Sequence, residues 1–243
     1  MSLEGHTLSP DESFGVFNRS SGTFVLPTLP FEITALVPIT GAETLGVHLG
    51  KHHQAYVDGA NRLMEPMAKK FETAVEVISF ARSIEAHGLL EQAGQALNHG
   101  FFWTCHQAAG LTRPDGSLEI AINGKFGDFA GFTDAAIALG KSRVGSGWIW
   151  LVADHEGAVR LELTRDAETL LDDPSLVVLL VCDIWEHAYY LDRASDRAGW
   201  IDGFFGQLAD WSMAKTRYEH GLSREPDAAL SVSSIPPNQR RRS

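Results

Sequence analysis

The chain has 243 residues, 44% of them hydrophobic, which is enough to bury a sizeable core in one large domain or two small ones. Its formal net charge of -11 argues against general nucleic-acid binding, and there is no run of about 18 apolar residues that would predict a membrane span. The two cysteines, Cys105 and Cys182, show no zinc-binding spacing, so we expect buried packing residues and a cytoplasmic protein.

Both ends of the chain are polar. Residues 1–23 are rich in Ser, Gly and acidic residues and are expected to form a flexible N-terminal extension. Residues 221–243 have the composition of a disordered tail. The folded part is therefore expected to begin near Phe24.

The first half of the folded part has the periodicity of helices. Helical patterns cover roughly residues 40–66, 72–86, 88–108 and 127–140. The stretch from Gly110 to Gly124 is predicted to be a loop, with a turn at Pro114–Gly116.

Strand patterns follow. Residues 147–153 and 158–164 alternate or are rich in β-forming residues, and Asp154–Gly157 between them predicts a hairpin turn. Residues 176–182 form a short apolar run, typical of a fully buried strand. Residues 200–219 predict a closing amphipathic helix. Helices followed by a small antiparallel sheet indicate an α+β fold.

Two helical segments place metal-binding side chains at regular spacing. His48, His52 and Tyr56 are four residues apart, so on a regular helix they share one face. Gln95 and His99 have the same spacing on a later helix. Imidazoles aligned in this way predict a candidate metal site.

A third segment supplies a carboxylate. Asp183 follows the buried strand directly, and His187 comes four residues later. A carboxylate in such a place is costly unless something pairs with it. Three imidazoles and one carboxylate suit iron, manganese or zinc. Zinc would favour hydrolysis at an open site, although no further general base is evident, so the ligands alone leave the reaction open.

Beyond these spacings, the sequence resembles the iron/manganese superoxide dismutase family from about Phe24 to Glu219. Four motifs carry the resemblance: His48–Tyr56 (HLGKHHQAY), Asn98–Trp103 (NHGFFW), Gly145–Trp150 (GSGWIW) and Asp183–Tyr190 (DIWEHAYY). It implies an N-terminal helical hairpin domain over residues 24–112, followed by a C-terminal α/β domain with a small antiparallel sheet over residues 113–220.

The resemblance also implies the chemistry. Members of the family convert superoxide to oxygen and hydrogen peroxide by cycling one metal ion per subunit between two oxidation states, an antioxidant function. The ligands carried over by motif are His48, His99, Asp183 and His187. The ion is expected to be iron, with manganese as the alternative.

Three further residues receive catalytic roles from the resemblance. Tyr56 is expected to gate the substrate funnel, with His52 behind it. Gln95 is expected to donate a hydrogen bond to solvent at the metal. Iron-type members carry this glutamine near the second ligand, whereas manganese-type members usually carry it where Ala167 stands here. The chain is therefore similar to the iron type.

The surroundings of the metal follow the same pattern. Trp103, Trp148 and Trp185 are expected to form walls around the ion. Lys51 and Arg197 match basic residues that flank the funnel, where they could attract a small anion in spite of the negative total charge.

In the family, the active sites of two subunits are linked. By resemblance, Glu186 of one subunit reaches the equivalent of His187 in the other, and Tyr190 reaches the equivalent of His52, so a homodimer is expected. A non-catalytic relative that reuses the fold as a structural subunit is the alternative function, and a zinc hydrolase with the same ligands is a third.

Overall fold

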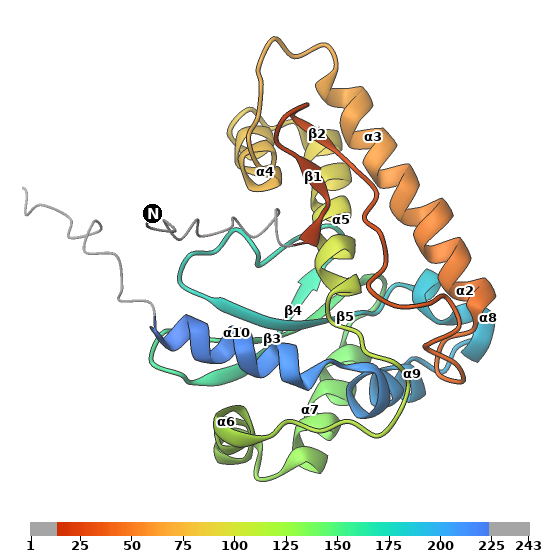
Figure 1. Cartoon of the computed structure of the whole chain (residues 1–243), viewed down its shortest axis with the longest axis vertical. Helices are drawn as coiled ribbons and strands as arrows, with labels where there is room; N and C mark the ends of the chain where they lie inside the picture. Colours follow the sequence, from red (N-terminus) through yellow and green to blue (C-terminus); the bar gives the residue numbers. More distant parts are fainter. Residues whose placement is uncertain (1–13, 224–243) are drawn as a thin grey trace, which may run out of the picture.

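The computed structural model describes residues 14–223. Figure 1 shows the helices α3, α4 and α5 together at one end of the molecule, and a three-stranded sheet with the remaining larger helices at the other. The expectations for residues 1–13 and 224–243 lie outside the described residues. Among the described ones, no helix is both long and apolar enough to cross a membrane.

Residues 14–23, assigned above to a flexible extension, are packed in the structure. Strand β1 (Phe17–Asn18) pairs antiparallel with β2 (Thr23–Phe24), and Gly22 makes the turn with a φ of 70°. Val16 is fully buried. The folded part therefore begins before Phe24, earlier than predicted, because the apolar side chains of this hairpin are few and separated by polar ones.

The predicted helix over residues 40–66 is present, but it is not regular. It consists of α2 (Ala42–Val47), a π-helical turn η1 (His48–His53) and α3 (Gln54–Met64). A π-helical turn holds about one residue more than an α-helical turn, so residues four and five apart both lie near the same side of it. This change of period falls on the first metal-binding motif.

The next helices confirm their predictions, with small shifts at the ends. They are α4 (Ala74–Ser83), α5 (His87–Trp103) and α7 (Phe129–Ser142). The hydroxyl of Thr73 caps α4 by accepting a hydrogen bond from the backbone N–H of Glu76. Helix α5 contacts both α3 and α4 and is buried along its C-terminal half.

The predicted loop from Gly110 to Gly124 is wrong over its second part. Residues Gly116–Phe126 form the helix α6, which packs against α7 and α10. Leu118 and Ile122, one helical turn apart, are fully buried in these contacts. Tertiary burial of this short apolar face outweighs the low helix propensity of the glycines at positions 116 and 124.

The three predicted strands are confirmed within one residue. They are β3 (Gly147–Ala153), β4 (Val159–Arg165) and β5 (Val177–Asp183), in the spatial order β4-β3-β5 with antiparallel pairs. The side-chain carboxylate of Asp154 accepts backbone hydrogen bonds in the predicted turn between β3 and β4. One end of the sheet therefore gathers the start of β3 and the ends of β4 and β5.

The closing region contains more elements than the single predicted helix over residues 200–219. Its elements are η2 (Glu186–Ala188), α8 (Tyr190–Arg193), α9 (Arg197–Gly203), the π-helical η3 (Phe204–Leu208) and α10 (Trp211–Ser223). The helix breaks at Ala209, which is extended and forms an isolated bridge with His106. Asp210 then accepts the backbone N–H of Met213 and starts α10.

Two hydrophobic clusters are present in the described chain. The smaller cluster joins strands β1 and β2 to α3, α4 and the first part of α5, including Leu97. The larger one surrounds the sheet and includes Phe101 near the end of α5, together with Cys105 and Cys182, both buried and free as expected. Helix α5 therefore passes from one cluster into the other, and His99 lies at the transition.

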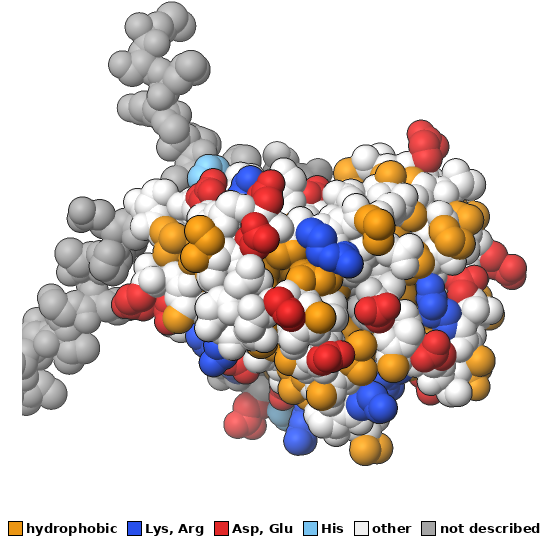
Figure 2. All heavy atoms as spheres, turned by 90° about the horizontal axis from the view of Figure 1, so that it is seen from below, with side chains coloured by type: hydrophobic (Ala, Val, Ile, Leu, Met, Phe, Trp, Pro, Cys, Tyr) orange, Lys and Arg blue, Asp and Glu red, His pale blue; other side chains and the backbone are white. Residues whose placement is uncertain are grey.

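Figure 2 shows one face of the molecule, where side chains of several chemical types are exposed. On this face, acidic and basic side chains are interspersed among hydrophobic ones.

Candidate metal centre

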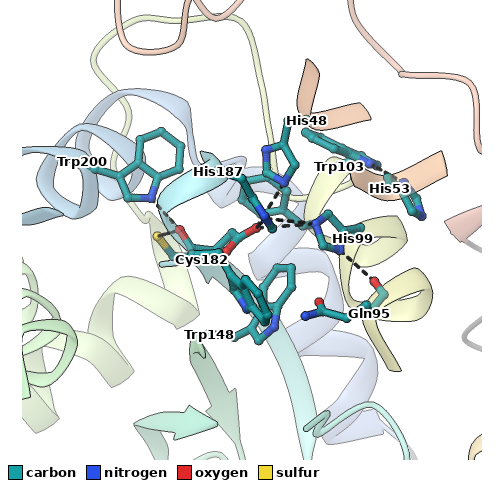
Figure 3. A network of polar contacts seen from close by, with 12 residues as sticks. His48, His53, Gln95, His99, Trp103, Trp148, Cys182, His187 and Trp200 are labelled. Carbon is teal, nitrogen blue, oxygen red and sulfur yellow. Dashed lines mark hydrogen bonds and ion pairs between the residues drawn. The ribbon is translucent and has the colours of Figure 1, made fainter. Parts of the chain in front are cut away.

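Four separate elements bring the predicted ligands together in the interior. His48 begins η1, His99 lies near the end of α5, Asp183 is the last residue of β5, and His187 lies in η2. Figure 3 shows the rings of His48, His99 and His187 gathered at one place. His48, His99 and Asp183 are at most 2% exposed, and His187 is partly buried.

The ligand atoms are as close as coordination of one ion requires. The Nε2 atoms of His187, His48 and His99 lie 3.0, 3.2 and 3.7 Å from Oδ2 of Asp183. The Nε2 atoms of His99 and His187 are 3.4 Å apart, and one ligand atom from each residue lies within 4.8 Å of all the others. Atoms that surround an ion at about 2.1 Å are separated by about 3.0–3.5 Å at their closest.

One buried atom supports this interpretation independently. Nε2 of His48 is enclosed 3.2 Å from Oδ2 of Asp183, and it has no hydrogen-bond partner among the described residues. A buried polar atom without a partner is unfavourable, whereas a nitrogen lone pair aimed at an ion is satisfied. The four side chains therefore fit a metal ion that binds nitrogen and carboxylate ligands.

The protonation states also suit a metal. Burial, reinforced by the neighbouring His187, lowers the pKa of His48 to about 4. Burial and the nearby His48 bring the pKa of His99 well below its usual value. Burial by itself would raise the pKa of Asp183, but His187 and His48 overcome it and lower the pKa. Neutral imidazoles and an ionised carboxylate are the forms that bind metals.

Hydrogen bonds from the backbone and from one indole hold the ligands in place. Nδ1 of His99 donates to the carbonyl of Gln95 at 2.8 Å, so the lone pair is on Nε2, which faces the centre. Oδ1 of Asp183 accepts the backbone N–H of Trp185 at 2.8 Å, which leaves Oδ2 for the centre. Nε1 of Trp200 donates to the Asp183 carbonyl at 2.6 Å. Partners of this kind fix the orientation of a metal ligand.

Indole rings enclose three of the four ligands, as the sequence analysis expected. The pairs, with the separation of ring centroids, are Trp103 and His48 at 4.8 Å, Trp148 and His99 at 4.9 Å, and Trp185 and His187 at 5.4 Å. These walls are apolar and restrict the approach of solvent to the ligand atoms.

The residues proposed as gate residues lie beside the ligands. The ring of His52 stacks on His187 with centroids 4.6 Å apart, and the ring of Tyr56 lies 5.2 Å from that of His99. Burial, helped by the charge of Asp183, raises the pKa of Tyr56 to about 12. The phenol is therefore protonated at neutral pH.

Gln95 is fully buried next to the ligand set. Its Nε2 lies 3.5 Å from the carbonyl of Asp166, and its Oε1 has no hydrogen-bond partner in the described chain. The preceding residue, Gly94, is so close to Ala167 that an added Cβ would lie 2.4 Å from the Ala167 carbonyl oxygen. Positions 95 and 167, the alternative glutamine positions of the sequence analysis, therefore belong to segments in direct contact.

His53 is a buried residue of the centre that the sequence analysis missed. Its Nδ1 accepts a 2.9 Å hydrogen bond from Nε1 of Trp103, and its Nε2 donates to the carbonyl of Ala96 at 3.0 Å. Burial lowers its pKa to about 3. The missed signal is the π-helical turn, whose wider period brings His53 as well as His52 to the centre, where the ring of His53 stacks on that of His99 with centroids 5.2 Å apart.

The two basic residues expected at the funnel differ in their surroundings. Lys51 is exposed on η1. The guanidinium of Arg197 instead connects separate segments of the chain by hydrogen bonds. It donates to the Tyr189 hydroxyl and to the carbonyls of Gly140, Arg143 and Gly145.

Comparison with known proteins decides the family. Residues 23–107 match the family model for the alpha-hairpin domain of iron/manganese superoxide dismutases, and residues 114–217 match the model for their C-terminal domain. The chain belongs to the iron/manganese superoxide dismutases. The two matched domains of this family meet at the candidate centre, with His48 and His99 in the first and Asp183 and His187 in the second.

Individual superoxide dismutases are similar over most of the chain. The iron superoxide dismutase of Legionella pneumophila is 39% identical over 194 residues, which cover 80% of this chain and 98% of that protein. The iron enzyme of Escherichia coli (strain K12) is 39% identical over 78% of this chain and 95% of its own length. A superoxide dismutase of Rickettsia bellii, described as manganese/iron, is 35% identical over 82% of this chain and 94% of its own length.

Proposed function

We propose that this protein is a superoxide dismutase that uses one iron ion per subunit, held by His48, His99, Asp183 and His187. The observation that carries the proposal is the convergence of three imidazole Nε2 atoms on one buried, ionised carboxylate oxygen. When bound, the ion supplies a one-electron couple that accepts an electron from one superoxide and returns it to the next. Its donor set of nitrogen and carboxylate suits two oxidation states.

The other residues control access and protons. Tyr56 holds a proton on its hydroxyl, because its pKa is raised to about 12, and it stands beside the ring of His99. Formation of hydrogen peroxide consumes two protons, so a protonated phenol next to the ligands is suitably placed to hold one. His52 continues this polar edge by stacking on His187. Lys51, exposed on the same π-helical turn, can attract the superoxide anion.

Gln95 is the residue that we assign to tuning the metal. Its amide lies in the buried interior with one unpartnered oxygen and a long contact from its nitrogen, so hydrogen-bonding capacity remains free. The relatives described as iron superoxide dismutases favour iron over manganese for this chain.

Metal analysis combined with a superoxide assay tests the proposal. Protein purified from iron-rich and from manganese-rich cultures should contain about one ion per subunit, and the iron form should dismutate superoxide faster. Protein without stoichiometric metal and without activity would instead support a structural relative. Zinc as the only bound metal, with no dismutation, would support a hydrolase. Activity found only in the manganese form would overturn the choice of iron.

We further propose a cytoplasmic homodimer with an antioxidant role. Glu186 and Tyr190 are both exposed on one side of the centre, next to Leu191, which is 63% exposed. Such exposure suits an interface through which Glu186 and Tyr190 of one subunit meet His187 and His52 of the other. Sedimentation at micromolar concentration should give a dimer. A fully active monomer would contradict this assembly.

A further inference from the structure

One backbone carbonyl collects three side-chain N–H groups around the candidate centre. The carbonyl oxygen of Asp166 lies 2.9 Å from Nε1 of Trp148, 3.3 Å from Nε1 of Trp185 and 3.5 Å from Nε2 of Gln95. A carbonyl oxygen has two lone pairs. The three donors together therefore use all of its capacity to accept hydrogen bonds. The donors come from β3, from the residues after β5, and from α5.

Each donor side chain is in turn adjacent to a proposed ligand. Trp148 packs edge-on against the ring of His99, and Trp185 stacks on His187. Gln95 supplies the carbonyl that accepts the hydrogen bond from Nδ1 of His99. The oxygen of Asp166 is therefore linked through one intervening residue to His99, by way of Trp148 and of Gln95, and to His187, by way of Trp185.

The backbone of Asp166 has an unusual conformation that directs this carbonyl. Its φ is +47°, in the left-handed region, which non-glycine residues rarely adopt and which Asn and Asp tolerate best. Its side chain is 64% exposed, and Oδ1 makes one long contact, 3.5 Å, with Nη2 of Arg143. The side chain therefore makes few contacts. The importance of the residue lies in the direction of its backbone carbonyl.

The next two residues continue the same arrangement. The carbonyl of Glu168 accepts a hydrogen bond from Nδ2 of Asn98 at 3.1 Å, and the carbonyl of Ala167 approaches the Cα of Gly94 closely. Segment 166–168 thus presents consecutive carbonyls to the part of α5 that carries Gln95 and His99. It occupies this place because β4 ends at the same end of the sheet where β3 begins and β5 ends.

We propose that Asp166 is a positioning residue for the metal centre. Its left-handed backbone places its carbonyl where that oxygen fixes both indoles and the amide of Gln95 around the ligands. One N–H of the amide is then directed to Asp166, and the other is left for the centre. The inference rests on the proposed function, since it concerns how the ion held by those ligands is tuned.

Substitutions that differ in their tolerance of positive φ test this role. In the iron-loaded protein, Asp166→Val disfavours the left-handed backbone, whereas Asp166→Asn tolerates it. For Asp166→Val we expect an altered ferric absorption spectrum. We also expect at least a threefold change in the one-electron equilibrium constant, about 28 mV at 59 mV per tenfold. Asp166→Asn should retain the spectrum and potential of the unchanged protein.

Glu85 provides a matched control for backbone strain. It also has positive φ, +54°, and it is exposed in the turn between α4 and α5, away from the ligands. Glu85→Val should lower the melting temperature as Asp166→Val does, but it should leave the spectrum and potential unchanged. If Asp166→Val does not accumulate, the pair Asp166→Ala and Glu85→Ala makes the same comparison with less steric conflict.

The outcomes separate this inference from the proposed function. An unchanged spectrum and potential in the Asp166 variant would overturn the positioning role, and so would an equal change in the Glu85 variant. If the unchanged protein binds no stoichiometric metal, the proposed function fails first, and the positioning role fails with it.

Discussion

The indole Nε1 of Trp103 donates a 2.9 Å hydrogen bond to Nδ1 of His53, and both side chains are buried. Because His53 donates from its other nitrogen to the carbonyl of Ala96, its tautomer is fixed with the proton on Nε2. The bond joins η1, which carries His48, to α5, which carries His99. It therefore holds two ligand-bearing elements at a constant separation without itself using a ligand.

Two histidines of the same turn should respond differently to substitution. His48→Ala should lose most of the bound metal, because it removes one of four ligands. His53→Gln should keep the metal at near stoichiometry while unfolding more easily, by about 1–3 kcal/mol, because buried polar partners are left without good hydrogen bonds. Elemental analysis and denaturant unfolding measure the two effects. Full metal content in His48→Ala would show that His48 is not a ligand.

Substitution of Gln95 should change the potential and leave the ion in place. A charge-assisted hydrogen bond is worth about 1.5–3 kcal/mol, and its loss in one oxidation state corresponds to about 65–130 mV. Gln95→Leu should therefore shift the midpoint potential by this order and lower turnover. Gln92→Leu, on the same helix but beside Gly59 rather than the ligands, is the control. An unchanged potential in Gln95→Leu would remove its tuning role.

The segment that leads into strand β1, which contains Val16, should be coupled energetically to α5. A Cβ added at Gly100 would lie 1.9 Å from Cγ1 of Val16, so Gly100→Ala should destabilise the protein by about 1–3 kcal/mol through overpacking. Combining it with Val16→Ala should recover much of that loss in a double-mutant cycle. Gly124→Ala, in α6 with open space around it, should be neutral or slightly stabilising. Strictly additive effects at Val16 and Gly100 would mean that the contact is absent in solution.

Buried His106 should make stability dependent on pH. Burial lowers its pKa from the ordinary 6.5 to about 3, and its Nδ1 donates to the carbonyl of Phe102. Between these values the unfolded chain binds a proton that the folded chain does not, so stability falls as pH decreases from about 6.5 towards 3. His106→Phe should reduce the slope of unfolding free energy between pH 6 and 4 by about 1.4 kcal/mol per pH unit. Equal slopes in both proteins would contradict a neutral His106.

The sequence was most informative where side-chain identity and spacing determine the structure. The strand over Gly147–Ala153 is predicted to the residue, because its aromatic and β-branched side chains admit few alternatives. Asp183 was singled out because a buried carboxylate needs a partner, and His187 and His48 lie 3.0 and 3.2 Å from its Oδ2. Family motifs then supplied the pairing of helices and sheet that periodicity could not.

Other features depend on contacts that single residues do not reveal. The helix α6 forms because α7 and α10 bury Leu118 and Ile122, which are too few to predict a helix alone. His53 was missed because its segment was predicted as a regular α-helix, whereas residues His48–His53 form a π-helical turn. Asp166 acts through its backbone carbonyl, so its side chain gives no indication of its neighbours.

The division of the proposed ligands between two segments has a thermodynamic consequence. His48 and His99 belong to the helical hairpin, whereas Asp183 ends the last strand of the sheet and His187 follows it. An ion held by both would be a cross-link between parts of the chain that otherwise meet through apolar packing and hydrogen bonds such as that from Asn98 to the Glu168 carbonyl. Separating the hairpin from the sheet would then break ligand bonds as well as apolar contacts. Metal loading therefore makes the two parts unfold as one cooperative unit.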